Sequence, residues 1–428
     1  MTTNKNHNSP NVPNSTDYGN AFRNVPALRF PEFSGEWKKC MIKDYGEVVT
    51  GNTPPTSNAE YYDNGSYLWA SPADLGVHKK ITDTRTKLTL SGFNKTRNVP
   101  IGSVLVTCIG STIGKMGMAT ETMSSNQQIN SIVVNDKSNS DFVYYAVSRA
   151  FPHYLSEVGV QAVPILSKSN FEKLPNFTTS RDEQDKLGYF LNLLDERIAT
   201  QNKIIEDLKK LKSAIIEKLF CSPKDKQPEV RLHGFSENWQ IIRLSEICHR
   251  IRCKNTEEQC KRVLTIAAQY GLVSQEEFFN KNVASENLSG YYLLQNGDFA
   301  YNKSYSGDYV WGTVKRLDNY EQGVLSPLYI CFRPDSAKVD SDFLVYYFES
   351  KKWHKAVADI AGEGARNHGL LNISVIDYFN TIHCIPSVDE QKQIAQIMSA
   401  LLSKIAREQR ILNCYTTQRQ YLLRQMFI

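Results

Sequence analysis

The chain has 428 residues, 41% of them hydrophobic, and a formal net charge of +5. This length suits two or three domains with ordinary hydrophobic cores, and no apolar run approaches the roughly 18 residues of a membrane-spanning helix. The nine cysteines include no CxxC pair, and Cys248, Cys253 and Cys260 beside His249 fit no standard zinc spacing. We therefore expect reduced thiols, no bound metal and a cytoplasmic protein.

Residues 1–22 are rich in Asn, Ser, Thr and Pro and contain no apolar segment. Their composition predicts a disordered tail and not a signal peptide. Residues 23–180 follow as a first globular domain of mixed α/β type. Short apolar runs such as 103–107 and 131–134 are bounded by Gly, Asn and Asp, which is typical of strands. A helix is expected to begin at Asp141.

Residues 181–220 predict one long helix, which residues 389–428 repeat. Thirty-nine residues correspond without a gap, from Asp182-Glu183-Gln184 and Asp389-Glu390-Gln391 onward. Alternating four- and three-residue spacing specifies a coiled-coil seam, and polar residues at two shared seam positions fix its register at a cost in stability. The alternative is two unrelated surface helices, each packed on its own domain. The predicted seam positions are Leu187, Leu191, Leu194, Ile198, Gln201, Ile205, Leu208, Lys212, Ile215 and Leu219 in the first helix, and Ile394, Met398, Leu401, Ile405, Glu408, Leu412, Tyr415, Arg419, Leu422 and Met426 in the second.

Residues 221–388 predict a second globular domain that echoes the first. A strand is expected at 328–332, and a helix beginning at Asp342 matches the one at Asp141. The chain is therefore a tandem duplication, with two α/β (α+β) domains in pseudo-two-fold arrangement and two long helices between them. A duplicated protein is well suited to a two-part target. Five residues near the start of each domain recur at an offset of 202, namely Pro26, Arg29, Phe33, Ser34 and Trp37 as Pro228, Arg231, Phe235, Ser236 and Trp239.

Two patterns that suggest catalysis do not meet the requirements of the chemistry. The segment Gly110–Lys115 has three residues between its glycines where a phosphate-binding loop needs four, and Met116 follows the lysine. It predicts a Gly-hinged hairpin that offers Ser111, Thr112 and Lys115 to a ligand. Pro334-Asp335 followed by the acid-x-Lys pattern at 349–351 resembles a nuclease motif. Residues 342–352 instead predict a helix, with Phe343, Tyr346, Tyr347 and Trp353 on the packed side. The adenine methyltransferase motif is also missing, since the only Pro-Pro pair, at 54–55, lacks both required flanks.

Several segments now resemble one known family, the specificity subunits of type I restriction–modification enzymes, over essentially residues 23–428. The resemblance rests on the runs 109–115 (IGSTIGK), 125–130 (SNQQIN), 301–307 (YNKSYSG) and 324–329 (VLSPLY), together with both Asp-Glu-Gln helix openings. It implies two target recognition domains, each reading one part of a split DNA sequence. It further implies antiparallel spacer helices that dock two adenine-methylating modification subunits, while restriction subunits add ATP-driven translocation and cleavage.

The resemblance gives the chain itself no catalytic residue and no cofactor, and it assigns S-adenosylmethionine, ATP and Mg²⁺ to the partner subunits. The dimensions of the long helices agree with this role. Two domains that read successive major grooves must lie roughly 34 Å apart. A 39-residue helix spans roughly 58 Å and can hold them at that distance, allowing for the tilt and bulk of each domain. The remaining alternative is a coiled-coil scaffold with two protein-binding domains.

Base edges are read by Arg, Lys, Asn and Gln, and phosphates are held by Lys, Ser and Thr. The candidate DNA-binding residues are Lys79, Lys80, Arg85, Lys87, Lys95, Arg97, Ser111, Thr112, Lys115, Asn126, Gln127, Arg250, Arg252, Lys254, Lys261, Arg262, Lys303, Ser304, Tyr305, Lys315 and Arg316.

Overall fold

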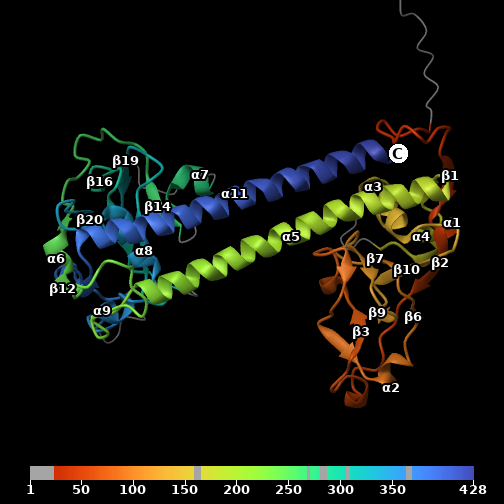
Figure 1. Cartoon of the computed structure of the whole chain (residues 1–428), viewed down its shortest axis with the longest axis horizontal. Helices are drawn as coiled ribbons and strands as arrows, with labels where there is room; N and C mark the ends of the chain where they lie inside the picture. Colours follow the sequence, from red (N-terminus) through yellow and green to blue (C-terminus); the bar gives the residue numbers. More distant parts are fainter. Residues whose placement is uncertain (1–23, 159–164, 268–269, 280–286, 305–308, 363–368) are drawn as a thin grey trace, which may run out of the picture. The chain divides into compact units, whose positions relative to one another are not determined.

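The computed structural model describes residues 24–158, 165–267, 270–279, 287–304, 309–362 and 369–428. The expected disordered tail, residues 1–22, therefore lies outside the described residues. The chain divides into two compact units. Unit 1 contains residues 1–202 and 411–428, and unit 2 contains residues 203–410. Each unit thus combines one globular domain with the end of a long helix that comes from the other half of the sequence (Figure 1).

Unit 1 is built on a five-stranded sheet with the order β2-β10-β7-β8-β4, a four-stranded sheet with the order β5-β3-β9-β6, and the pair β1-β11. The predicted strands at 103–107 and 131–134 are confirmed as β7 and β10, which pair antiparallel. The strands are β1 (Lys38–Met41), β2 (Gly46–Thr50), β3 (Tyr67–Ala70), β4 (Lys80–Ile81), β5 (Thr86–Leu88), β6 (Asn98–Val99), β7 (Val104–Thr107), β8 (Met116–Ala119), β9 (Met123–Ser125), β10 (Ile129–Val134) and β11 (Pro175–Thr178). The helices of this half are α1 (Ile42–Tyr45), α2 (Leu90–Phe93), α3 (Ser140–Val158), α4 (Lys168–Glu172) and α5 (Arg181–Leu219), with short 3₁₀ turns at Ala59–Tyr61 and Pro72–Asp74.

Unit 2 repeats this plan with a four-stranded sheet in the order β13-β20-β17-β18 and the pairs β12-β21, β14-β15 and β16-β19. The predicted strand at 328–332 is confirmed as β20, although it begins two residues later. The strands are β12 (Gln240–Arg243), β13 (Cys248–Arg250), β14 (Leu264–Ala267), β15 (Gly271–Ser274), β16 (Tyr292–Gln295), β17 (Phe299–Asn302), β18 (Thr313–Arg316), β19 (Gln322–Leu325), β20 (Ile330–Pro334) and β21 (Ile382–Ile385). The helices are α6 (Leu244–Ile247), α7 (Gln275–Phe279), α8 (Ser341–Glu349), α9 (His354–Ala358), α10 (Val375–Phe379) and α11 (Val388–Met426).

The predicted duplication is confirmed at the level of single hydrogen bonds. Asn139 accepts from the Phe142 amide at 2.9 Å before α3, and Asp340 accepts from the Phe343 amide at 2.9 Å before α8. The side-chain oxygen of Gln184 accepts a hydrogen bond from the Asn139 backbone N–H at 2.9 Å. In the same way, that of Gln391 accepts from the Asp340 backbone N–H at 2.7 Å. The two halves therefore share one device that joins the start of a long helix to the start of a domain helix.

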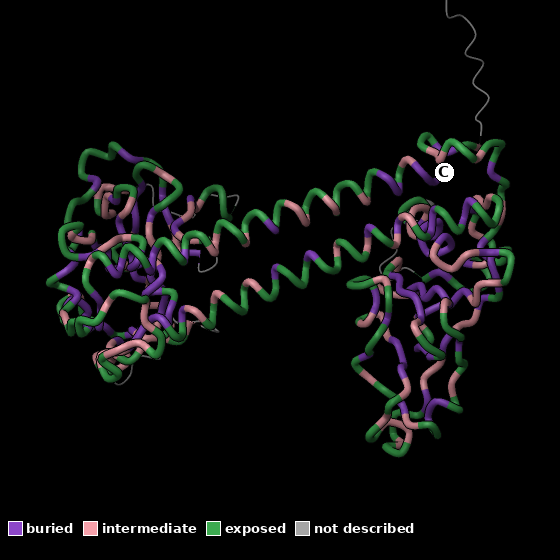
Figure 2. The backbone as a smooth tube through the Cα atoms, viewed as in Figure 1, coloured by how far each residue is buried: buried purple, intermediate pink, exposed green. Residues whose placement is uncertain are grey.

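Both long helices are confirmed, as α5 and α11, and every predicted seam position along them is buried or half-buried. In Figure 2 the buried and half-buried residues recur as short purple and pink segments between exposed ones along each helix. In unit 1 the two helices are joined directly, because the guanidinium of Arg419 on α11 binds the carboxylate of Asp195 on α5. In unit 2, Lys212 on α5 binds Glu349 at the end of α8 at 2.6 Å. The two predicted basic seam residues thus each pair with a carboxylate inside their own unit.

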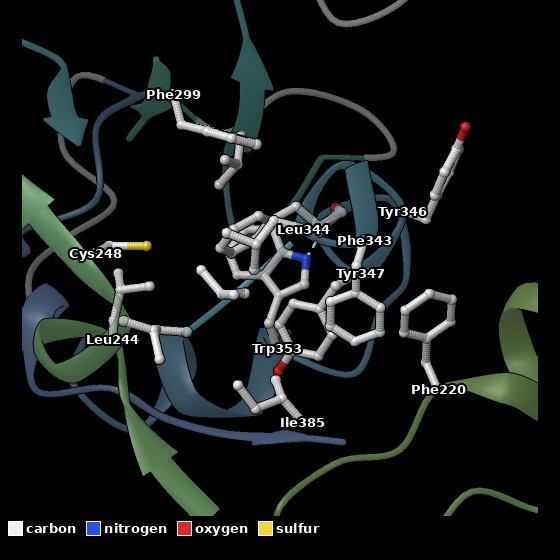
Figure 3. Packing of buried hydrophobic residues seen from close by; sticks show 14 of the residues in the cluster. Phe220, Leu244, Cys248, Phe299, Phe343, Leu344, Tyr346, Tyr347, Trp353 and Ile385 are labelled. Atoms are coloured by element: carbon white, nitrogen blue, oxygen red, sulfur yellow. Dashed lines mark hydrogen bonds between the residues drawn. The ribbon is translucent and has the colours of Figure 1, made fainter. Parts of the chain in front are cut away.

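The core of each unit forms where the domain helix meets the end of a long helix. In unit 1 the ring of Phe427 lies 5.4 Å from that of Phe142 and 5.8 Å from that of Trp37. In unit 2 the ring of Phe220 lies 5.3 Å from that of Phe343, beside Tyr347 (Figure 3). The expectation that Phe343, Tyr346, Tyr347 and Trp353 lie on the packed side of this segment is confirmed, since all four are buried.

Candidate nucleic-acid interface

A cleft of about 760 Å³ in unit 1 collects several of the predicted DNA-binding cations. Its walls are the residues before β4, the loop between β7 and β8, and parts of α3, α5 and α11. Because these segments are far apart in the sequence, the fold alone brings their charges together. The basic side chains in its lining are those of His78, Lys79, Lys80, Lys115 and Arg419, and the acidic ones are those of Asp195 and Glu196.

Lys79 is the least accessible of these cations, with 6% of its side chain exposed. Its ammonium lies 2.6 Å from the carboxylate of Asp141 and 3.0 Å from the hydroxyl of Tyr145, and 4.2 Å from the centre of the Tyr145 ring. Burial lowers the pKa of Lys79, and the hydrogen bond that its ammonium donates to the Asp141 carboxylate opposes that shift. The Tyr145 hydroxyl in turn donates to Asp195 at 2.7 Å. Lys79 therefore belongs to a polar network that holds the domain against the long helices. Its ammonium is bound by partners inside unit 1.

The predicted Gly-hinged hairpin is confirmed as the connection between β7 and β8. Thr107 donates its amide to the Lys115 carbonyl at 2.8 Å, and Gly114 donates to the Thr107 carbonyl at 2.9 Å. Gly110 and Gly114 have φ values of +97° and +90°, a region that side chains disfavour. A Cβ on Gly114 would also lie 2.8 Å from the Phe151 ring. The hairpin leaves Ser111 and Lys115 exposed and Thr112 half-buried, so it can present them to a ligand.

The remaining candidates of unit 1 lie on surface segments outside the cleft lining. Arg85, Lys87, Lys95, Arg97 and Gln127 are all exposed, whereas Asn126 is 7% exposed. Lys87 pairs with Asp83 at 2.8 Å, a surface ion pair that water screens strongly. The buried Asn126 side chain binds Gln128 at 3.0 Å, which is a contact that shapes the loop. Arg97 and Gln127 carry the side-chain types that read base edges, and both are accessible.

Unit 2 carries a corresponding set of accessible cations. Arg250, Arg252, Lys254, Lys261 and Arg262 are all exposed; Arg250 ends β13, and the other four lie between β13 and β14. Arg250 donates to the hydroxyl of Tyr292 at 3.4 Å, and the guanidinium of Arg262 lies 4.4 Å above the ring of Tyr320. Stacking on a tyrosine fixes a guanidinium while leaving its edge free to donate hydrogen bonds. Neither Tyr292, in β16, nor Tyr320, between β18 and β19, could be assigned this role from the sequence, because both tyrosines are far from these arginines along the chain.

Two other predicted cations of unit 2 have internal partners. Arg316 binds Asp342 at 2.7 Å and Asp318 at 2.6 Å. Burial lowers the pKa of Lys315, opposed by the carboxylate of Glu349. Arg316, at the end of β18, thus pairs with Asp342 in α8 as Lys79, just before β4, pairs with Asp141 in α3. Lys303 and Ser304 are half-buried, and Tyr305 lies outside the described residues.

The nuclease-like residues have other partners as well. Glu349 lies in helix α8, as expected, but the helix ends at this residue and not at 352. Glu349 binds Lys212, while Asp335 lies 3.6 Å from Lys338 and 3.7 Å from His249. Within the described ranges, no three His, Cys, Asp or Glu side chains are grouped so that they could hold a metal ion. The described helices also include none that is long and apolar enough to cross a membrane.

Comparison with known proteins points to one family. The family described as "Type I restriction modification DNA specificity domain" matches residues 34–210 and again residues 236–414. The chain is 24% identical over 408 residues to the type I restriction enzyme MjaVIII specificity subunit of Methanocaldococcus jannaschii, covering 89% of this chain and 88% of that one. It is 30% identical over 151 residues to the HindI specificity subunit of Haemophilus influenzae, a match that spans 34% of this chain and 32% of that protein.

The fold agrees with these matches. The crystal structure of the type I restriction–modification S subunit from M. genitalium superposes with a TM-score of 0.58 at 17% identity, over 94% of this chain and 99% of that one. The two matched segments cover both repeated halves, including most of each long helix. The chain belongs to the family of type I restriction–modification DNA specificity subunits, with one specificity domain in each half.

Proposed function

We propose that this chain is the non-catalytic, DNA-reading subunit of a type I restriction–modification complex, and that each unit reads one half of a bipartite, asymmetric target. The observation that carries the proposal is the repetition of accessible base-reading side chains on two equivalent scaffolds. Lys95, Arg97 and Gln127 are exposed in unit 1, and Arg250, Lys254 and Arg262 are exposed in unit 2. The two sets differ in sequence, while the hydrogen bonds that join each domain helix to its long helix are shared. The units therefore suit two different half-sites.

The partners follow from the family. Double-stranded DNA is the ligand, two modification subunits dock on the paired helices, and restriction subunits complete the complex in the cytoplasm. The seam positions of α5 and α11 would form an antiparallel coiled coil that sets the unread spacer between the half-sites. In this proposal S-adenosylmethionine, ATP and Mg²⁺ act in the partner subunits, which carry out adenine methylation, translocation and cleavage. This chain contributes only DNA binding and the spacing between the two half-sites.

The test uses the full chain purified together with its modification subunits. Fluorescence binding to a random-sequence duplex is measured across a salt series, because each neutralised phosphate contributes about 0.9 to the slope of log affinity against log salt. Sequencing of methylated adenines in the host genome then gives the target. A steep salt slope and a bipartite target support the proposal. Affinity that does not depend on salt, with no methylation motif, would instead favour a scaffold with two protein-binding domains.

A further inference from the structure

One half-buried side chain, that of Asn52, gathers three segments of unit 1 that are far apart in the sequence. Its amide nitrogen donates to the Lys95 carbonyl at 2.9 Å, and its amide oxygen accepts from the Arg97 backbone N–H at 2.8 Å. The backbone N–H of Asn52 donates to the Ser125 carbonyl at 2.9 Å. The residues after β2, the loop after α2 and the end of β9 are therefore bound to one another through this residue.

The surrounding contacts make this junction rigid. The Trp69 indole donates to the Asn52 carbonyl at 3.1 Å. A Cβ on Gly51 would lie 2.2 Å from the Ser125 carbonyl oxygen, so the two segments pack backbone to backbone, and only glycine fits. The Thr53 hydroxyl donates to the Gln127 amide oxygen at 2.6 Å. Asn52 thereby fixes the backbone that carries Lys95 and Arg97. The next residue, Thr53, orients the side chain of Gln127.

Unit 2 contains a corresponding asparagine, Asn255, whose side-chain amide also binds loop backbone. Asn255 follows β13, the strand that corresponds to β2, and it is 2% exposed. Its amide nitrogen donates to the Cys260 carbonyl at 2.8 Å, and its amide oxygen accepts from the Cys260 N–H at 3.1 Å. The turn that Asn255 closes leads directly into the exposed Lys261 and Arg262. In both units the side-chain amide of an asparagine that follows the first strand of the main sheet binds loop backbone next to exposed cations.

We infer that Asn52 and Asn255 are positioning residues for base reading, each acting on its own half-site through the loop that it holds. The inference rests on the proposed function. Arg97 suits a bidentate contact to guanine, and Gln127 suits one to adenine. In unit 2, Arg262 is held by Tyr320 stacking and by the clamped turn, and it suits guanine. Asn52 and Asn255 contact the protein backbone, and their effect on DNA passes through these neighbours.

The experiment compares Asn52→Ala and Asn255→Ala in the full chain with its modification subunits, using a methylation library in which every target position is varied. We expect Asn52→Ala to relax selectivity about 5- to 150-fold at positions of one half-site only, and Asn255→Ala to do so at the other half-site only. The double variant Asn52→Ala/Arg97→Ala should resemble Arg97→Ala alone, because Asn52 acts through Arg97. Asn94→Ala removes an exposed amide from the same loop and should leave both half-sites unchanged.

Other outcomes separate the possible failures. Unchanged selectivity in both variants, with wild-type DNA binding intact, would overturn the positioning role and leave the proposed function standing. Loss of affinity for every duplex together with a lower melting temperature would show that the asparagines only support folding, which also overturns the inference. Absence of DNA binding by the wild-type complex would remove the proposed function and this inference together.

Discussion

Arg29 binds the carboxylate of Glu183 through two parallel hydrogen bonds of 2.7 Å, although the two residues are 154 positions apart. The Glu183 side chain is 1% exposed. Arg231 repeats the arrangement with Glu390 at 3.0 and 2.9 Å, and the Glu390 side chain is again 1% exposed. A bidentate guanidinium–carboxylate pair has a defined geometry. The pair therefore fixes the angle at which each long helix leaves its domain.

The first prediction concerns the stability of this junction. Glu183→Ala removes the carboxylate and leaves the Arg29 guanidinium without its partner in a site of low exposure, so we expect a loss of about 3 kcal/mol in the free energy of unfolding. The double substitution Arg29→Met/Glu183→Leu should recover most of that loss, because no buried charge remains unpaired. Denaturant unfolding measures both, and Glu196→Ala, at an exposed site, is the control. Equal losses in the single and double variants would contradict this account.

The second prediction concerns pH. Burial lowers the pKa of His383 to about 4, against 6.5 for the exposed side chain, and the ring lies between the Tyr347 hydroxyl at 2.9 Å and the Thr381 hydroxyl at 2.8 Å. Between these pH values the unfolded chain binds the proton and the folded chain does not. Stability should therefore fall as pH decreases from 6.5 to 4, by at most about 3 kcal/mol from this residue. In His383→Gln the melting temperature should depend less on pH in that window, and an unchanged dependence would refute the assignment.

The third prediction distinguishes accessible cations from internal ones. Lys115→Ala should lower the log–log salt slope of DNA binding by about 0.9, and the double substitution of Arg250 and Arg252 by alanine should lower it by about 1.8. Lys79→Met should leave the slope unchanged and lower the melting temperature, because its ammonium is bound to Asp141. A reduced slope in Lys79→Met with normal stability would show that Lys79 contacts phosphate instead.

The fourth prediction treats α5 as a ruler. Inserting four residues after Gln201 lengthens the helix by about 6 Å and nearly completes one turn, so the seam continues. The unread spacer should grow by about one or two base pairs while both half-sites persist, since B-DNA rises 3.4 Å per base pair. Inserting two residues rotates the downstream seam by roughly 200° and should abolish assembly. Methylation sequencing of an active four-residue variant with an unchanged spacer would disprove the ruler.

The sequence predicted the scaffold well because repeats and periodic spacing can be recognised directly from the order of residues in the chain. The seam from Leu187 to Leu219, the hairpin around Gly110 and Gly114, and the helix at Asp342 all follow from local spacing, and the structure confirms each. Such features need only neighbouring residues, so a single sequence is enough to find them.

Individual roles were harder to predict because they depend on partners that are far apart in the chain. Nothing near Lys79 in the sequence indicates that Asp141 and Tyr145 enclose its ammonium, and nothing near Arg316 indicates Asp342. Asn52 and Asn255 were missed for the same reason, although a Gly-Asn-Thr step directly after a strand is a usable signal for the first of them. Charge clusters in a sequence thus predict a basic surface better than they predict which cations are accessible.

The placement of Phe427 beside Trp37 and Phe142 has a consequence for synthesis on the ribosome. Domains made one after another usually complete their cores in order of translation. Here the second unit receives Phe220 before its own strands are made, whereas the first unit lacks part of its core until residues 411–428 emerge. The half that is translated first is therefore the half that finishes folding last. Until then, the newly made chain exposes apolar surface that holdase chaperones are suited to cover.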